Sequence, residues 1–496
     1  ATLKLSNYVL LFSLLFVALK NLWNQRNLWT QRVFIFGGIS FFILLILRLS
    51  FLKYTLLPGY SDSPVHYQII ENFLHPDIEP AFRYSFANIF SNYYHFGFHS
   101  LTAWLVTVSN ISIADAISLL GQLFLVVAPI SISFLVYILN KDMRSAFFAG
   151  LLAAIGWYMP AFAVNWGKFP ALAALSAFPA LIGYSLSQAE KFARRKNLSV
   201  FILLSMGLIL LHTRMIFLLS LVVLSYLIVS KMDFDERLEY PKSVLYALLF
   251  LVVLYPLLNP LEYFYAPGIV SGMLLVLLPF AFREYLRSTV TVLTFVGGLW
   301  IVGALPTFLR IPILFNKEFL EMLLYIPLSV VGGLGLSGAL KNFSRFAQLQ
   351  KALPVFLVLL VVFSFSGSGV LYPDPCCDYF QESDAQAFEY LDENLPDNSL
   401  ILISSFKNST INSGTDAGLW ITPLLKLPTN NFYYDANWAV PDRLEEICKF
   451  GAEHVFVYVG GREYSFNNTV LAQTTWYEEV FHSGKTVIYR IKSCSE

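Results

Sequence analysis

Long apolar runs constrain this chain more than any other feature of its sequence. Twelve segments reach or approach the roughly 20 mostly apolar residues that a helix needs to cross a bilayer. They are 5–22, 33–52, 112–139, 146–165, 169–188, 198–211, 214–230, 243–262, 267–282, 288–306, 320–340 and 353–372. Only 13% of the 496 residues are charged, against roughly 25% in a soluble protein. We therefore expect an α-helical polytopic membrane protein with about twelve transmembrane helices.

The charge balance excludes one large class of partners. The chain has 33 Lys and Arg against 33 Asp and Glu, so its formal net charge is zero. Proteins that bind the phosphate backbone of nucleic acids need an excess of Lys and Arg. We therefore expect no nucleic-acid partner, and the lipid bilayer is the first partner that the sequence predicts.

Lys and Arg are concentrated in alternate loops, which predicts the topology. The basic set comprises Lys20, Arg26, Arg32, Lys141, Arg144, Lys191, Arg194, Arg195, Lys196, Lys231, Arg237, Lys242, Arg283, Arg287, Lys341, Arg345 and Lys351. Because basic loops stay in the cytoplasm, loop 53–111 and everything after residue 372 face outward in a multi-pass plasma-membrane protein. The apolar stretch 95–109 is too short to span, and counting it would reverse all later loops. We expect it to be a helix at the outer interface.

Polarity rises sharply after Tyr372, which predicts a second domain. We expect residues 1–372 to form the membrane domain and residues 373–496 to form a small extracytoplasmic α/β domain. Its predicted helices are 384–395, capped by Ser383 and Gln386, and 441–450. Its predicted strands are 399–404, 453–459, 476–481 and 485–491, the last two forming a hairpin. Recognition, or covering of the membrane domain, is the expected role.

All four cysteines follow the last apolar run, as expected for a domain exported to an oxidising compartment. They are Cys376, Cys377, Cys448 and Cys494, and three pairings are open. A bond between the adjacent Cys376 and Cys377 is sterically awkward, so bonds from each to Cys448 and Cys494 are favoured. Free thiols are the alternative.

The outer loop 53–111 is long enough to be functional. Its Asp62 precedes a short amphipathic segment, 65–74, and serves either as a general base or metal ligand or as a helix cap. Four of the seven histidines lie in the same loop: His66, His75, His95 and His99. His66 and His99 are candidate ligands or hydrogen-bonded filler, and Tyr94 belongs either to an interfacial aromatic belt or to a sugar-stacking wall.

Several cations lie beside the spans on the same outer face. His212 and Arg214 interrupt an apolar stretch, 198–230, and ionisable residues at membrane depth are usually functional. Arg214 is suited to hold a phosphate, although snorkelling to headgroups is the alternative. Lys168 and Arg310 are the other outer cations. One acid facing several cations favours a phosphate-bearing lipid substrate over an ion channel.

The chain resembles the GT-C superfamily of integral-membrane glycosyltransferases between about residues 33 and 491. The motifs are SDSPVHY (61–67), YYHFGFH (93–99), WGKFPALAALSAFPALI (166–182), GLILLHTRMIFLLSL (207–221), TDAGLWITPLLKLPT (415–429) and VIYRI (487–491). The segment at 166–182 and the tail are similar to uncharacterised bacterial and archaeal members. The hairpin at 207–221 is similar to arabinose- and mannose-transferring members.

The resemblance implies an inverting transfer of a sugar from a polyprenyl-phosphate carrier to a glycan, lipid or protein acceptor on the outer face. Only Asp62 matches the family's catalytic acid, and it would remove the proton from the acceptor hydroxyl. Arg214, with Lys168 or Arg310, would stabilise the leaving phosphate.

Two departures from the family pattern narrow this expectation. The nearest string to the W-W-D-x-G motif of oligosaccharyltransferases is YYDANW (433–438), so that activity is not expected. No acidic pair lies between spans 146–165 and 169–188, so a metal-independent reaction is favoured, with a divalent metal as the open alternative.

An inactive GT-C-fold scaffold or assembly subunit is the rival function. A transporter is disfavoured because the sequence has no internal repeat.

Overall fold

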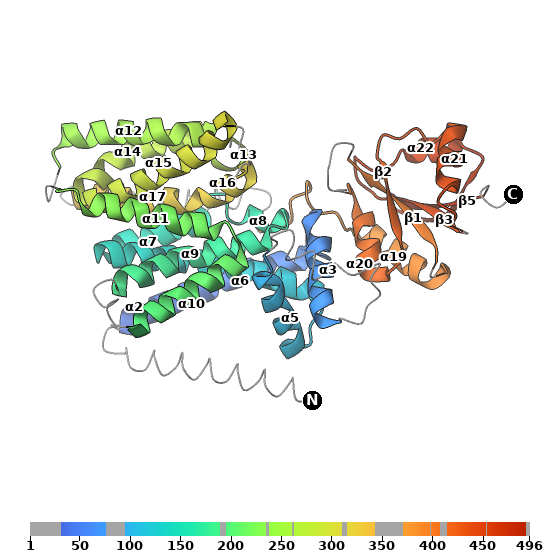
Figure 1. The fold of residues 1–496 in the computed structure, drawn as a ribbon, viewed down its shortest axis with the longest axis horizontal. Helices are drawn as coiled ribbons and strands as arrows, with labels where there is room; N and C mark the ends of the chain where they lie inside the picture. Colours follow the sequence, from blue (N-terminus) through green and yellow to red (C-terminus); the bar gives the residue numbers. More distant parts are fainter. Residues whose placement is uncertain are drawn as a thin grey trace.

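The computed structural model describes residues 31–75, 95–188, 195–234, 238–259, 262–309, 315–342, 371–396, 398–406, 414–452 and 454–492. A helical bundle lies on one side and an α/β domain on the other, with α3 (Asp62–Leu74) and α5 (Gly97–Ser109) between them (Figure 1). The predicted span 5–22 and residues 353–370 of the last predicted span lie outside the described residues, as do Tyr94, Arg310 and Cys494.

The predicted apolar runs form the helices of the bundle. Its long helices are α2 (Gln31–Leu49), α6 (Ile113–Asn140), α7 (Met143–Ile155), α9 (Phe169–Gln188), α10 (Arg195–Leu211), α11 (Met215–Ser230), α12 (Tyr240–Leu258), α14 (Pro267–Glu284), α15 (Leu286–Leu309) and α17 (Tyr325–Asn342). Its short helices are η2 (Ser50–Tyr54), α8 (Phe162–Asn165), α13 (Glu262–Tyr265) and α16 (Lys317–Leu323). Within the described ranges, six helical segments are long and apolar enough to cross a membrane, one of them being α16 and α17 together. The total of about twelve spans stays a prediction.

Two predicted spans are interrupted. The segment 146–165 forms α7 up to Ile155 and, after a turn, the short helix α8. Pro160 lies in that turn, and proline cannot supply the amide hydrogen that a continuous helix would need. The segment 320–340 breaks at Leu324 into α16 and α17. Pro327 follows in the first turn of α17, where proline is tolerated.

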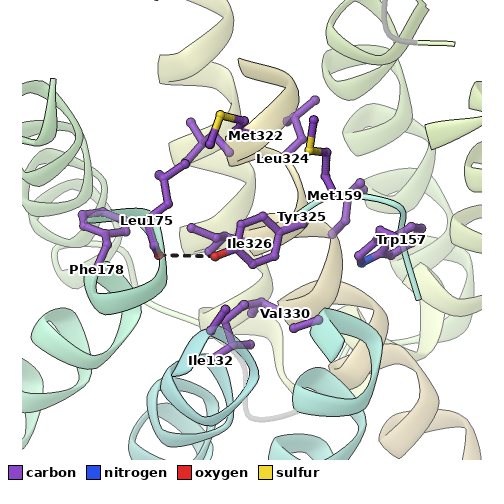
Figure 2. Close-up of a cluster of buried hydrophobic side chains, with 14 of the residues drawn as sticks. Ile132, Trp157, Met159, Leu175, Phe178, Met322, Leu324, Tyr325, Ile326 and Val330 are labelled. Carbon is purple, nitrogen blue, oxygen red and sulfur yellow. Dashed lines mark hydrogen bonds between the residues drawn. The ribbon is translucent and has the colours of Figure 1, made fainter. Parts of the chain in front are cut away.

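Small residues allow α17 to pack closely in the centre of the bundle. A Cβ at Gly333 would lie 2.5 Å from the backbone nitrogen of Ala149 on α7, and one at Gly338 would lie 2.5 Å from the carbonyl oxygen of Phe280 on α14. Such close approach is how membrane helices gain contact area where the apolar solvent gives no hydrophobic drive. The core beside it is continuous, and the Tyr325 hydroxyl donates to the carbonyl of Leu175 on α9 at 3.3 Å (Figure 2).

A polar cluster lies at the end of the bundle whose loops are rich in Lys and Arg. The carboxylate of Asp142, between α6 and α7, accepts hydrogen bonds from the hydroxyl of Tyr285 and, at 2.9 Å, from that of Ser337. The ammonium of Lys341 lies 3.2 Å from the same oxygen. The 28 residues of α6 separate this end from α5 by roughly 40 Å, at 1.5 Å per residue.

The C-terminal domain is a five-stranded mixed sheet with helices. Its strands are β1 (Leu400–Ser405), β2 (Thr429–Tyr433), β3 (Val455–Val459), β4 (Tyr477–Ser483) and β5 (Thr486–Ile491), in the order β2-β1-β3-β5-β4. β1 pairs in parallel with β2 and β3, and β5 pairs antiparallel with β3 and β4. The helices are α19 (Glu382–Asn394), η5 (Ala417–Trp420), α20 (Ile421–Leu425), α21 (Pro441–Cys448) and α22 (Asn468–Gln473).

The elements predicted for this domain form within two residues of their expected bounds, but β2 was missed. Its sequence, TNNFY, has three polar residues in a row and lacks the apolar run of a buried strand. The predicted cap of α19 is also wrong. The backbone amide of Gln381 donates to Asp384 at 2.9 Å, whereas the hydroxyl of Ser383 lies 2.9 Å from that of Thr486 on β5.

The predicted cysteine pairing is wrong for Cys376 and Cys377, which are bonded to each other. A tight turn brings the two side chains together, because Asp374 accepts from the amides of Cys376 and Cys377 at 2.9 Å each. The two adjacent cysteines alone do not reveal this turn, so the bond could not be expected from the sequence. Cys448 is disulfide-bonded as well.

The C-terminal domain rests on the outer loop of the bundle. The Tyr67 ring on α3 packs edge-on against Trp420 at 5.7 Å, and Lys426 forms an ion pair with Glu71 of α3. The amide of Tyr60 donates to the carbonyl of Cys377 at 2.8 Å. The outer loop and the C-terminal domain therefore lie at the same end of the bundle.

Candidate functional site

The candidate site is centred on an ion pair between Asp62 and Lys168. The ammonium nitrogen of Lys168 lies 2.6 Å from Oδ2 of Asp62, and the two side chains are 29% and 37% exposed. Asp62 is the first residue of α3, and Lys168 directly precedes α9. The helix begins at Asp62 and not at residue 65, and Ser61 occupies the cap position. The carboxylate of Asp62 is therefore directed to another part of the chain.

Gly167 gives the loop before Lys168 its shape. Its φ of +61° lies in the left-handed region, where a side chain would be strained, and a Cβ there would lie 2.8 Å from Oγ of Ser63. Its carbonyl oxygen lies 3.0 Å from Nε2 of His66, one turn after Asp62 on α3. This second link between α3 and the loop holds Lys168 beside Asp62.

His66 and His99 form a buried imidazole pair, with His66 Nδ1 2.9 Å from His99 Nε2. Since the Gly167 carbonyl can only accept, Nε2 of His66 carries the hydrogen and Nδ1 accepts from His99. Burial lowers the pKa of His66 to about 4 and that of His99 well below its ordinary value. Both imidazoles are therefore neutral near pH 7.

A second pair of rings extends the site toward α10 and α16. The centroids of His95 and His212 lie 4.3 Å apart, and His212 stacks on Phe319 of α16 at 5.2 Å. Burial lowers the pKa of His95 to about 3 and that of His212 well below its ordinary value. Arg214 opposes protonation of both rings through space and Lys168 opposes that of His212, so this second histidine pair lies near both cations.

Arg214 lies in the turn between α10 and α11, and its guanidinium is fixed on two sides. NH1 donates to Oδ1 of Asn316 at 2.8 Å, and the guanidinium carbon lies 5.1 Å from the ring centroid of Phe319. Burial lowers the pKa of Arg214, and the negative charge of Glu318 partly offsets this effect. The side chain therefore presents a positioned cation at the membrane end that holds Asp62.

Tyr60 connects this site to the C-terminal domain. Its φ of 66° is unusual for a residue with a side chain, and such strain tends to occur at functional sites. Its ring lies 6.0 Å from the Lys168 ammonium and 5.8 Å from the ring of Tyr379. The loop that carries Asp62 is thus held by both domains.

Most predicted site residues come together in the structure. The sequence analysis named Asp62, His66, His99, Lys168, His212 and Arg214, and all lie in this neighbourhood. It missed Tyr60, Gly167, Asn316, Glu318 and Phe319. Among these residues only Gly167 had a signal in the sequence, because it stands beside the charged Lys168 directly before a predicted helix. The others are ordinary interfacial residues in sequence, so only their contacts reveal them.

The described residues around Asp62 do not form a divalent-metal site. No group of three His, Cys, Asp or Glu within the described ranges has metal-binding geometry. The ammonium of Lys168 lies against the carboxylate where a ligated cation would have to approach. We derive no step through a metal.

The sequence matches a family of unknown function, DUF6541, over residues 2–313. The chain belongs to this family. A search among curated proteins finds no match to this DUF6541 protein.

Two solved structures that are similar to this chain are an oligosaccharyltransferase and an arabinofuranosyltransferase. The oligosaccharyltransferase of Archaeoglobus fulgidus, tethered with an acceptor peptide, aligns with a TM-score of 0.53 at 11% identity, covering 85% of this chain and 69% of that one. The arabinofuranosyltransferase AftD from Mycobacteria aligns with a TM-score of 0.47 at 12% identity, covering 94% of this chain and 40% of that one. At this identity the likeness to the oligosaccharyltransferase shows the fold alone.

Proposed function

We propose that this DUF6541 protein is an inverting glycosyltransferase that uses a polyprenyl-phosphate-linked sugar on the outer face of the membrane. The observation that carries the proposal is one carboxylate, Asp62, in contact with one cation, Lys168, which lies with a second cation, Arg214, close enough to His212 to oppose its protonation. The cations come from different helical hairpins but lie at one end of the bundle. The similarity in fold to an oligosaccharyltransferase supports glycosyl transfer, and the apolar helices would supply the lipid environment that the carrier needs.

The proposed reaction assigns a role to each charged group. Asp62 accepts the proton of the acceptor hydroxyl as its oxygen bonds to the anomeric carbon. The bond between that carbon and the phosphate oxygen breaks on the opposite face, which inverts the configuration. Lys168 and Arg214 stabilise the charge on the leaving lipid phosphate. A phosphate leaves without prior protonation, so the scheme needs no general acid.

Lys168 would exchange partners during this cycle. While its ammonium holds Oδ2 of Asp62, it occupies acceptor capacity of the carboxylate that a substrate hydroxyl would use. The four-carbon stem of lysine is flexible, and a lipid phosphate is a competing anion within its reach. Donor binding would therefore draw Lys168 away and free the carboxylate for the acceptor.

The acceptor is better described as a glycan or lipid than as a peptide. Trp438 in the string YYDANW is fully buried and packs 4.6 Å from the ring of Phe466. It therefore belongs to the core of the domain and is not placed to contact a peptide. This supports a reaction other than oligosaccharyl transfer to protein.

Loss of the carboxylate tests the proposal. Purified protein in lipid nanodiscs is incubated with labelled polyprenyl-phosphate mannose, glucose, galactose and arabinose, together with membrane glycan acceptors. Asp62→Asn should abolish transfer and preserve folding. Asp115→Asn is the matched control, because Asp115 is an exposed acid in the first turn of α6 at the same end of the bundle. Full transfer by the Asp62→Asn protein would refute the mechanism.

An inactive scaffold subunit is the second candidate, and the ion pair itself favours it. A carboxylate permanently held by Lys168 would be a structural contact between α3 and the loop before α9. This alternative predicts no transfer by the wild type with any donor. It also predicts that Asp62→Asn and Lys168→Met impair assembly of a co-purifying complex.

A further inference from the structure

Three aromatic residues lie at the carboxyl ends of the parallel strands in the C-terminal domain. Phe406 directly follows β1, Tyr434 directly follows β2, and Tyr464 lies in the loop after β3. The chain runs from the central β1 to β2 on one side and then to β3 on the other. In open α/β sheets, ligands bind outside the carboxyl ends of the strands at such a reversal of strand order.

The three rings form one cluster, which we call the aromatic trio. The centroid of Phe406 lies 5.8 Å from that of Tyr434 and 5.5 Å from that of Tyr464, and the two tyrosine rings are 5.4 Å apart. Phe406 is 39% exposed and Tyr464 is 41% exposed. Exposed apolar surface gathered in one place favours a binding site over scattered surface residues.

Hydrogen bonds within the loops that follow the parallel strands hold the trio in place. The amide of Tyr434 donates to the carbonyl of Ser405 at 3.0 Å, and the hydroxyl of Thr415 donates to the carbonyl of Tyr464 at 2.7 Å. Next to Thr415, the fully buried Asp416 accepts from the Ser404 hydroxyl at 2.8 Å and also binds the loop after β3. A platform fixed before binding loses little conformational entropy when a ligand arrives.

The residues around the trio indicate the chemistry of the ligand. Asp435 and Glu463 are exposed and adjoin Tyr434 and Tyr464 in sequence. Carboxylates accept hydrogen bonds from hydroxyl groups and repel anions. Aromatic rings pack against the apolar C–H face of a sugar ring. Together these features favour a neutral saccharide over a phosphorylated or acidic ligand.

The loop that carries Tyr464 is connected to the part of the molecule that holds Asp62. Arg462, two residues before Tyr464, donates to the carbonyl of Cys376 at 2.6 Å. The neighbouring carbonyl of Cys377 accepts from the amide of Tyr60 in the Asp62 loop at 2.8 Å. A short series of direct contacts thus connects the carboxyl edge of the sheet to the ion pair.

We propose that Phe406, Tyr434 and Tyr464 form a subsite for a neutral oligosaccharide, which acts as the acceptor glycan. The role of this oligosaccharide as the acceptor rests on the proposed function, whereas the binding of a saccharide to the trio does not. The trio holds sugar rings distant from the reacting hydroxyl and leaves the chain end free to reach Asp62.

Binding is measured on the full protein in nanodiscs without any donor, by saturation-transfer NMR and titration with mannopentaose and cellopentaose. Trigalacturonate serves as the acidic comparison. Phe406→Ala and Tyr464→Ala should each weaken pentasaccharide binding by about tenfold or more, because each removes one ring on which a sugar packs; tenfold corresponds to about 1.4 kcal/mol. Tyr433→Ala is the matched control, since Tyr433 is 46% exposed and adjoins the trio without belonging to it. Tyr464→Leu keeps apolar bulk but loses the flat ring, so its weakened binding would separate stacking from folding.

The outcomes distinguish this inference from the proposed function. Pentasaccharide binding that is lost in the trio variants, kept in Tyr433→Ala and absent for trigalacturonate supports the subsite, whether or not transfer is seen. Absence of binding by the wild type, or equal loss in the Tyr433→Ala control, overturns it. Transfer by a protein that binds no pentasaccharide would overturn the subsite and leave the proposed function standing.

Discussion

The ammonium of Lys168 lies 2.6 Å from the carboxylate of Asp62, although 106 positions separate the two residues. The helix that carries Asp62 and the loop that carries Lys168 are joined a second time by the hydrogen bond from the His66 imidazole to the carbonyl of Gly167. The pair therefore depends on a positioned loop.

Replacing Lys168 separates its catalytic role from its structural one. The ion pair is about one third exposed, so Lys168→Met should change the free energy of unfolding by only about 0–1 kcal/mol. If Lys168 stabilises the leaving phosphate, the same variant should lower kcat by about 100-fold. Lys168→Arg keeps the charge and should restore part of the rate. Equal rates for wild type and Lys168→Met in the nanodisc transfer assay would contradict this role.

Gly167→Ala should displace Lys168. The left-handed backbone costs an alanine about 1–2 kcal/mol, and the new Cβ would also lie 2.8 Å from Ser63. Gly451→Ala is the matched control, because Gly451 has a φ of +67° with no atom within 4 Å of the added Cβ. Thermal unfolding should show a loss in both proteins, while transfer activity should fall only in Gly167→Ala. A loss of activity in the control would point to general destabilisation.

The buried histidines predict acid sensitivity above the range of ordinary carboxylates. The pKa of His66 is lowered by burial from 6.5 to about 4, so between these values the unfolded chain binds a proton that the folded one excludes. Stability should therefore fall as the pH drops from 6.5 toward 4, and be unaffected by this group above 6.5. His66→Gln should flatten the dependence of melting temperature on pH in this window. An unchanged slope would show that other groups dominate.

Asp142 should stabilise the opposite end of the bundle. Burial alone would raise the pKa of Asp142, but hydrogen bonds from Tyr285, Ser337, the amide of Arg144 and Lys341 lower it to about 2. Its contribution is thus complete above its ordinary pKa of 3.8 and is lost as the pH falls through about 2.

Asp142→Asn should therefore cost about 1–3 kcal/mol at pH 7, since polar partners are left without their charged acceptor. Tyr285→Phe, which removes one donor, should cost less. The test is thermal unfolding in detergent at pH 7. An Asp142→Asn protein as stable as the wild type would show that the cluster is not a stabilising contact.

Much of the fold could be predicted from local patterns. The run at 169–188 became α9 with those bounds, and the stretch at 95–109 became α5, because length and apolar content decide such helices without reference to partners. The polar strand β2 could not be predicted, since its place depends on pairing with β1 and not on its own residues. The bond between Cys376 and Cys377 likewise depends on a turn around Asp374.

The sequence by itself determined that this chain has many apolar helices, a separate polar domain, and a few costly charges beside its spans, since burial of apolar side chains and exclusion of charge act residue by residue. Only the tertiary structure decided which of those charges meet. The pairing of Asp62 with Lys168, the imidazole contacts of His66 and the seating of Arg214 against Asn316 are long-range contacts. Such contacts arise from the packing of whole helices, and a side chain cannot encode its partner alone.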